Sequence, residues 1–115
     1  MSDGPRVYSY WQRQALKTHR CVECLGDIQP SEKYEIFNGC WDGSWDEYKT
    51  CLPCVELRLS LGELDSPPDF GGLFGYVLDD GTAEQYAAVI KIYQDKNMFV
   101  PPYMLTTLQQ LINQS

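Results

Sequence analysis

Two pairs of cysteines constrain this chain more than any other feature of its sequence. Cys21 and Cys24 form one Cys-x-x-Cys turn, Cys51 and Cys54 form a second, and 26 residues separate the two turns. A Cys-x-x-Cys turn can direct two sulfur atoms at a centre about 2.3 Å away, and two turns that face each other complete a tetrahedral site. The spacing therefore predicts one structural zinc ion, Zn²⁺, bound by four thiolates.

A zinc site closed by four thiolates leaves no position free for a substrate, so we expect the chain not to be an enzyme. A catalytic zinc would need an open position and a nearby general base, and the sequence contains a single histidine, His19. We expect this histidine to lie beside the site or on the surface. The alternative is thiol redox chemistry at Cys51-Leu-Pro-Cys54, but such motifs follow a strand of a parallel sheet, and here the preceding strand belongs to a hairpin.

The segment between the two cysteine pairs predicts a β-hairpin. Residues 33–41 and 44–50 are rich in strand formers and flank Asp42-Gly43, the preferred pair for a two-residue turn of type I′. A bulge at Asn38-Gly39 is the alternative, and it would shift the register by one residue. Pairing outward from the turn places two sets of side chains on opposite faces. One face carries Phe37, Trp41 and Tyr48, and the other carries Tyr34, Ile36, Trp45 and Cys40, the last expected as a buried apolar residue.

Helical patterns fill the second half of the chain. A helix is expected to begin inside the second cysteine pair, with Leu57, Leu61 and Leu64 at helical spacing, although residues 55–61 also alternate as a strand would. A short helix is predicted at residues 73–78.

Two longer helices follow. Thr82 and Gln85 form a capping box that opens a helix to about Asn97, and Pro101-Pro102 can start a last one. The side chains expected to face inward are Tyr86, Val89, Ile90 and Tyr93 in the first helix, and Leu105, Leu108, Leu111 and Ile112 in the last.

Charge divides the sequence into two parts. Residues 1–20 sum to +3, from Arg6, Arg13, Lys17 and Arg20 against Asp3, whereas the other 95 residues sum to −10, which gives the net −7. Residues 63–84 contain six acids and neither lysine nor arginine. Because binding to phosphate backbones depends on clustered cations, this distribution disfavours nucleic-acid binding by the acidic body and leaves it open for the basic arm.

The first twenty residues mix basic and aromatic side chains. Pro5 and the helix formers from Gln12 to Lys17 are compatible with a short helix. We expect a terminal arm that packs Tyr8, Tyr10 or Trp11 on the core. No apolar signal segment and no run of eighteen apolar residues occurs, and five cysteines without an export signal fit a reducing cytoplasm.

Five short runs of residues carry a resemblance to known proteins. They are His19-x-Cys21-x-x-Cys24, Ile28-x-Pro30-x-Glu32-x-Tyr34, Gly39-x-Trp41-Asp42-Gly43, Tyr48-Lys49-Thr50-Cys51-x-x-Cys54-x-x-Leu57-Arg58 and Phe70-Gly-Gly-Leu73. Over about residues 17–80 they resemble a group of small phage and prophage zinc-finger proteins of treble-clef type. The resemblance implies the same four cysteine ligands, the chain order knuckle, hairpin and helix, and the cytoplasm of a bacterial host. That group has no settled function and often carries further cysteines after the helix, which this chain lacks.

Together these observations predict an α+β protein. Its parts are an N-terminal arm (1–20), a treble-clef-like zinc lobe (21–64), a linker with a short helix (65–81) and a two-helix C-terminal extension (82–115). The helices of the extension could bury their stripes within one chain or in a homodimer. No contact with a membrane is expected.

Three functions fit this pattern. The first is a non-enzymatic adaptor that binds a host or phage protein. The second is an inhibitor whose acidic surface mimics nucleic acid, and the third is a nucleic-acid-binding finger that uses Arg6, Arg13, Lys17 and Arg20. The contact surface expected for the adaptor comprises Trp41, Trp45 and Tyr48 of the hairpin and Asp79, Asp80 and Glu84 of the acidic segment.

Overall fold

The computed structural model describes residues 7–62 and 68–114 and has an α+β fold with a four-cysteine cluster consistent with a zinc finger. Within these residues, strands β1, β4 and β5 form an antiparallel sheet in the order β1-β4-β5, and β2 pairs with β3. The strands are β1 (Val7–Gln14), β2 (His19–Arg20), β3 (Asp27–Ile28), β4 (Lys33–Trp41) and β5 (Ser44–Cys51). The helices are α1 (Leu52–Leu59), α2 (Leu73–Asp80), α3 (Ala83–Asp95) and α4 (Pro102–Asn113).

The β4–β5 hairpin has the predicted turn and register. Asp42 and Gly43 have φ angles of 50° and 82°, as a type I′ turn requires. Trp41 lies opposite Ser44, and the pairing continues without interruption to Tyr34 opposite Cys51. The alternative bulge at Asn38-Gly39 is therefore absent from this pairing, and the predicted faces of the hairpin are confirmed.

The N-terminal arm differs from its expectation, because Val7–Gln14 forms a strand and the short helix that residues 12–17 allow is absent. Tyr8, Tyr10 and Trp11, expected to pack on the core, keep 57%, 63% and 44% of their surface exposed. The strand pairs antiparallel with β4, with Trp11 opposite Ile36 and Arg13 opposite Tyr34. The free edge of β4 offers unpaired backbone groups, and the alternating aromatic residues before Gln12 favour an extended chain over the helix formers that follow. Residues 7–14 of the basic arm are therefore the third strand of the sheet.

The helices begin where the sequence predicts. Helix α1 starts at Leu52, inside the second cysteine pair, and ends at Leu59, while Leu64 lies outside the described residues. The capping box of α3 is present, since the Gln85 amide donates to Thr82 Oγ1 at 3.2 Å and the Thr82 amide donates to Gln85 Oε1 at 2.9 Å.

Helix α4 corrects a second prediction, because the side of the helix that packs on the core differs from the predicted one. Met104 is buried, and Leu108 and Leu111 pack partly against the core. In contrast, Leu105 and Ile112 keep 50% and 51% of their surface exposed. The reason is geometric: α4 packs mainly on one neighbour, α3, so only a narrow stripe of the helix is covered. In α3, the predicted Tyr86, Val89 and Ile90 are buried, and Tyr93 stacks on Phe74.

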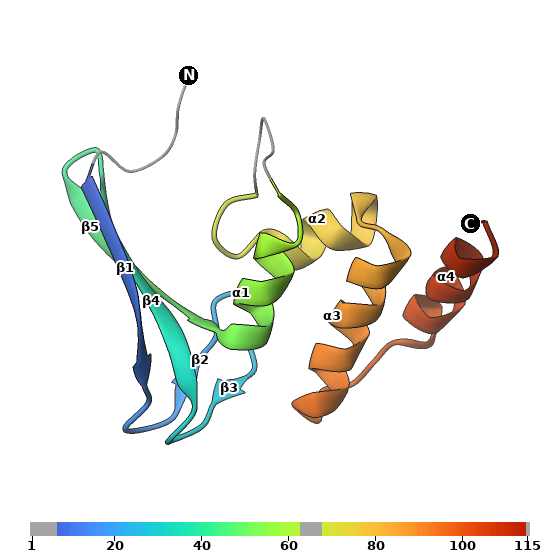
Figure 1. The fold of residues 1–115 in the computed structure, drawn as a ribbon, viewed down its shortest axis with the longest axis horizontal. Helices are drawn as coiled ribbons and strands as arrows, with labels where there is room; N and C mark the ends of the chain where they lie inside the picture. Colours follow the sequence, from blue (N-terminus) through green and yellow to red (C-terminus); the bar gives the residue numbers. More distant parts are fainter. Residues whose placement is uncertain (1–6, 63–67, 115) are drawn as a thin grey trace.

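All four helices lie on the same side of the three-stranded sheet (Figure 1). Helix α1 packs on β4 and β5, α3 packs on α1, and α4 follows at the outside. A single cluster of buried residues extends from Ala15 to Met104, so the four-cysteine region and the C-terminal helices share one core. Among the described helices none is long and apolar enough to cross a membrane.

Candidate metal centre

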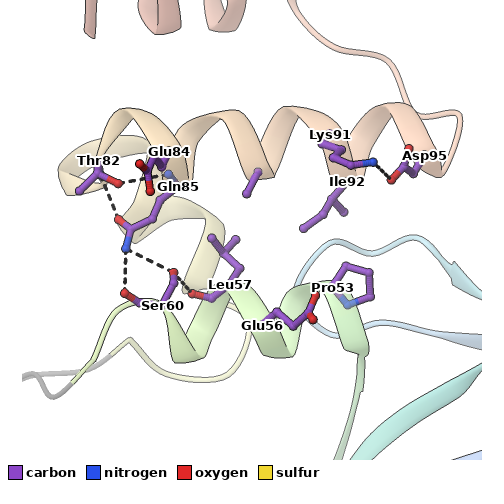
Figure 2. Close-up of a pocket in the computed structure, with 11 residues that line it drawn as sticks. Pro53, Glu56, Leu57, Ser60, Thr82, Glu84, Gln85, Lys91, Ile92 and Asp95 are labelled. Atoms are coloured by element: carbon purple, nitrogen blue, oxygen red, sulfur yellow. Dashed lines mark hydrogen bonds and ion pairs between the residues drawn. The ribbon is translucent and has the colours of Figure 1, made fainter. Parts of the chain in front are cut away.

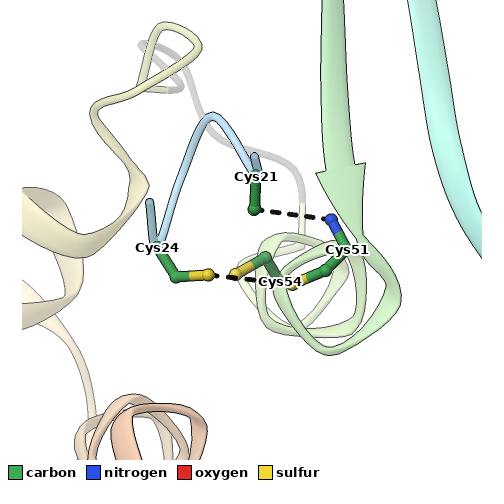
Figure 3. A group of neighbouring side chains, drawn as sticks. All are labelled: Cys21, Cys24, Cys51 and Cys54. Carbon is green, nitrogen blue, oxygen red and sulfur yellow. Dashed lines mark hydrogen bonds between the residues drawn. The ribbon is translucent and has the colours of Figure 1, made fainter. Parts of the chain in front are cut away.

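Four cysteine sulfurs meet between the first turn of α1 and the turn after β2. Figure 3 shows Cys21 and Cys24 from that turn facing Cys51, which ends β5, and Cys54 of α1. All four side chains are buried, and their Sγ atoms lie within 4.8 Å of one another. This confirms that the two Cys-x-x-Cys turns face each other and form one site.

The spacing of the sulfurs fits a tetrahedral zinc ion. The Sγ atoms of Cys24 and Cys51 are 3.9 Å apart, and a tetrahedron with zinc–sulfur bonds of about 2.3 Å has edges of about 3.8 Å. The group consists of sulfur donors alone, which is the ligand set of closed structural sites. These four residues could therefore bind zinc in a structural role. Such an ion would join two turns that are distant in sequence.

Backbone amides stabilise negative charge on the sulfurs. The amides of Glu23 and Cys51 each donate to Cys21 Sγ at 3.4 Å, and the amide of Gly26 donates to Cys24 Sγ at 3.4 Å. Cys51 is also the N-cap of α1, so the positive end of that helix faces the site. A thiolate that accepts such bonds is stabilised relative to its thiol.

The four sulfurs are coupled through their protons. The pKa of Cys21 lies far below its ordinary value, because the neighbouring sulfurs of Cys24, Cys51 and Cys54 stabilise its thiolate. The pKa of Cys54 is raised by the neighbouring sulfurs, that of Cys21 first, and by burial. Binding of zinc by all four sulfurs therefore releases protons.

The remaining candidate ligands lie outside this group. Cys40 is half-buried in β4, where it faces Trp45. His19 is half-buried in β2, and its ring lies 5.1 Å from that of Tyr34. The pKa of His19 is lowered by burial and by the charges of Lys49, Lys17 and Arg13. Neither residue belongs to the sulfur cluster, as the sequence predicted for both.

Glu23, between Cys21 and Cys24, connects the first cysteine turn to helix α2. Its carboxylate accepts hydrogen bonds from the amides of Gly71 at 3.0 Å and Leu73 at 3.2 Å. The side chain is 7% exposed, and burial raises the pKa of its carboxyl. Sequence reasoning missed this residue, because a Cys-x-x-Cys pattern treats the positions between its cysteines as spacers.

Lys96, the C-cap of α3, makes a second contact near the cysteine cluster that the sequence did not reveal. Its Nζ donates to the carbonyl oxygen of Asp27 at 3.3 Å. Gly26 leaves room for it, because a Cβ at that glycine would lie 2.5 Å from Lys96 Cδ. Burial opposes the charged form of the lysine, but interaction with the sulfurs of Cys51 and Cys24 outweighs it and raises its pKa. Its charge offsets part of the net −2 of a zinc ion with four thiolates.

We expect Lys96→Met to weaken zinc binding about 10- to 100-fold, as loss of a contact behind the ligands does elsewhere. The measurement is competition for zinc against a chromophoric chelator. Lys91→Met is the matched control, because Lys91 lies on α3, the helix that precedes Lys96, and forms an exposed ion pair with Asp95 at 2.9 Å. Equal zinc affinity in the two variants would contradict a role for Lys96.

The residues predicted to contact a partner do not form one surface. Trp41 and Tyr48 lie on the face of the sheet that α1 covers, with ring centroids 5.9 Å apart, whereas Trp45 lies on the opposite face. Asp79 and Asp80 end α2, and Glu84 lies in the first turn of α3. In Figure 1 the β4–β5 turn and the α2–α3 connection lie on different sides of α1.

Trp41 and Tyr48 belong to an aromatic cluster that the sequence showed only in part. Phe70, from the loop before α2, stacks on Tyr48 with centroids 4.4 Å apart and contacts Phe37 at 4.9 Å. On the other side of Phe37, Tyr8 lies at 5.4 Å. Internal packing therefore accounts for much of the aromatic surface at this position.

Comparison with known proteins does not extend the motif evidence. No family model matches the chain, and no match is found among curated proteins or solved structures. The resemblance to phage zinc-finger proteins thus depends on the motif residues alone, and the treble-clef assignment stays a prediction. What the geometry establishes is an α+β chain whose four clustered cysteines could bind one structural metal ion.

Proposed function

We propose that this chain is a non-enzymatic, zinc-stabilised adaptor that binds a basic segment of another protein. The observation that supports the proposal is a groove of about 560 Å³ between α1 and α3 (Figure 2). Leu57, Ala88 and Ile92 supply its apolar lining. This groove, and not the hairpin, is the proposed contact surface.

The rim of the groove is acidic. Glu56, Glu84 and Asp95 line it, and Lys91, the one basic residue among the described lining residues, is paired with Asp95 at 2.9 Å. An apolar floor with an acidic rim is complementary to an amphipathic helix that carries lysine or arginine beside its apolar face. A second protein with such a segment is therefore the partner class.

Both walls of the groove are connected to the metal centre. Helix α1 carries Cys54, and Lys96, the residue that caps the C-terminus of α3, donates to the carbonyl oxygen of Asp27, just after the first cysteine pair. At the other end, Gln85 Nε2 bridges to the carbonyl oxygen of Ser60 at 3.1 Å and to its hydroxyl at 3.3 Å. A bound zinc would hold the groove open before a partner arrives, which reduces the entropic cost of binding.

An acidic inhibitor that mimics nucleic acid is the alternative function. Its contacts would be made by exposed acids complementary to a basic partner surface. Of the three acids proposed for contact, Glu84 lines the groove, while Asp79 and Asp80 are exposed at the end of α2. Glu63 and Asp65 lie outside the described residues.

By the motif resemblance, we further propose that the protein originates from a phage or prophage and acts in the cytoplasm of a bacterial host.

The test uses a fluorescein-labelled amphipathic peptide of about 16 residues, long enough to form a helix, with leucine on one face and lysine on the other. We expect the zinc-loaded chain to bind this peptide and raise its fluorescence anisotropy. The same peptide with glutamate in place of lysine is expected to show no increase in anisotropy. Ala88→Arg is expected to weaken binding at least about tenfold, because it fills the groove and opposes the peptide charge.

Gln109→Arg on α4 is the matched control, because it adds the same charge at an exposed position away from the groove. It is expected to bind like the wild type. The proposal fails if the wild type does not distinguish the two peptides, or if Ala88→Arg and Gln109→Arg bind the lysine peptide equally.

A further inference from the structure

The face of the three-stranded sheet that points away from the helices combines tryptophan with clustered cations. We call it the outer face. In one row across the strands, Trp11 lies opposite Ile36, which lies opposite Lys49. In the next row Arg13 lies opposite Tyr34. Because side chains alternate along a strand, these residues project from the same face.

A depression of about 390 Å³ lies on the outer face. Trp11, Arg13, Lys17 and Lys49 line it, together with the buried Tyr34. Trp11 keeps 44% of its surface exposed, so a flat ligand can reach its ring. Trp11, Arg13 and Lys49 project from paired strands, which hold them in fixed positions, whereas Lys17 lies in the connection between β1 and β2.

The charge of the depression is positive although the whole chain is acidic. Glu47, the one acid in the described lining, pairs with Lys49 at 2.7 Å, whereas within residues 7–62 and 68–114 neither Arg13 nor Lys17 forms an ion pair. The acids of the groove lie on α1 and α3, on the other side of the sheet. Salt at physiological strength screens charges beyond about 8 Å, so the local cations dominate what a ligand meets here.

We propose that the outer face binds single-stranded nucleic acid, with a base stacked on Trp11 and the backbone phosphates held by Arg13, Lys17 and Lys49. An open aromatic ring beside cations is the combination that binds single strands, because unpaired bases offer a free face for stacking and the phosphates pair with the cations. A duplex keeps its bases stacked on each other and cannot use Trp11 in this way. The surface is separate from the α1–α3 groove.

The test is fluorescence anisotropy of labelled oligo-dT and oligo-U of about 20 nucleotides, longer than the site of one binding domain, with the zinc-loaded full chain. We expect binding at low salt, and a slope of log affinity against log salt of about −2 for three phosphate contacts. Comparison of the two oligonucleotides shows whether DNA or RNA is preferred.

Variants on one strand separate the two faces of the sheet. Trp11→Ala is expected to weaken binding about tenfold or more by loss of stacking, and Trp11→Phe is expected to restore part of it. Tyr10→Ala is the matched control, because Tyr10 is the adjacent residue on the opposite face, against Phe37. A second pair of variants tests the contribution of charge. Arg13→Glu, on the outer face, is expected to abolish binding. Lys33→Glu makes the same change on the face that carries Phe37 and is expected to bind like the wild type.

Three results would overturn the proposal. The first is no anisotropy change at about 50 mM salt, where the electrostatic contribution to binding is large. The second is equal binding by Trp11→Ala and Tyr10→Ala, with zinc content and circular dichroism showing both variants folded. The third is tighter binding of a duplex of the same length, which would assign the surface to double-stranded nucleic acid instead.

Discussion

Replacing Cys54 with serine is expected to leave the chain without a cooperative fold. Zinc bound by four thiolates contributes on the order of 10 kcal/mol or more of apparent binding free energy, and this is coupled to folding. A domain of this size is stable by only about 5–15 kcal/mol, so loss of the site removes most or all of that margin. The measurements are native mass spectrometry, which counts zinc per chain, and thermal unfolding by circular dichroism.

Cys40→Ser provides the matched control for this prediction. Cys40 is half-buried in β4 and lies outside the cluster of four sulfurs. We expect this variant to keep one zinc ion per chain and a single unfolding transition close to that of the wild type. Equal stability of Cys40→Ser and Cys54→Ser, or a wild-type count other than one zinc, would refute the assigned site.

Arg58→Ala is expected to produce the second largest loss of stability. Arg58 Nη2 of α1 donates to both carboxylate oxygens of Glu35 on β4 at 2.9 Å, and the Glu35 side chain is only 7% exposed. Removal of the arginine leaves a buried carboxylate without its partner. We expect a cost of about 3 kcal/mol, at the lower end of the range for broken buried pairs, because Arg58 itself is partly in water.

Urea denaturation in the presence of zinc measures this effect. Lys91→Ala, which breaks the exposed pair with Asp95, is the control and is expected to cost no more than about 0.5 kcal/mol. The double variant Glu35→Leu with Arg58→Leu is expected to recover most of the lost stability, because neither charge then remains buried. A cost for Arg58→Ala no larger than that for Lys91→Ala would show that the pair contributes little.

Local signals in the sequence were sufficient to predict several elements of the fold. The Asp42-Gly43 turn sets the register of its own hairpin, and the Thr82–Gln85 box sets the start of α3, because each depends on residues close in sequence. Four cysteines in two turns were sufficient for the zinc prediction for the same reason. Each turn aligns two ligands by itself.

Other features depend on contacts between distant segments. The pairing of β1 with β4 could not be inferred from residues 7–14, whose composition fits both a strand and a helix. The stacking of Phe70 on Tyr48 and the exposure of Leu105 depend on how separate elements pack, and a periodic pattern does not show which neighbour will cover it.

The sequence by itself determined the four candidate ligands, the hairpin between them and the helix that follows. Only the tertiary structure decided that β1 pairs with β4, which places its basic residues on a face of the sheet. It also decided that α3 lies against α1, which forms the groove with the acidic rim. The physical reason is the range of the interactions. Turns, caps and Cys-x-x-Cys geometry depend on a few neighbouring residues, whereas a face or a groove exists only once distant segments have buried their apolar sides together.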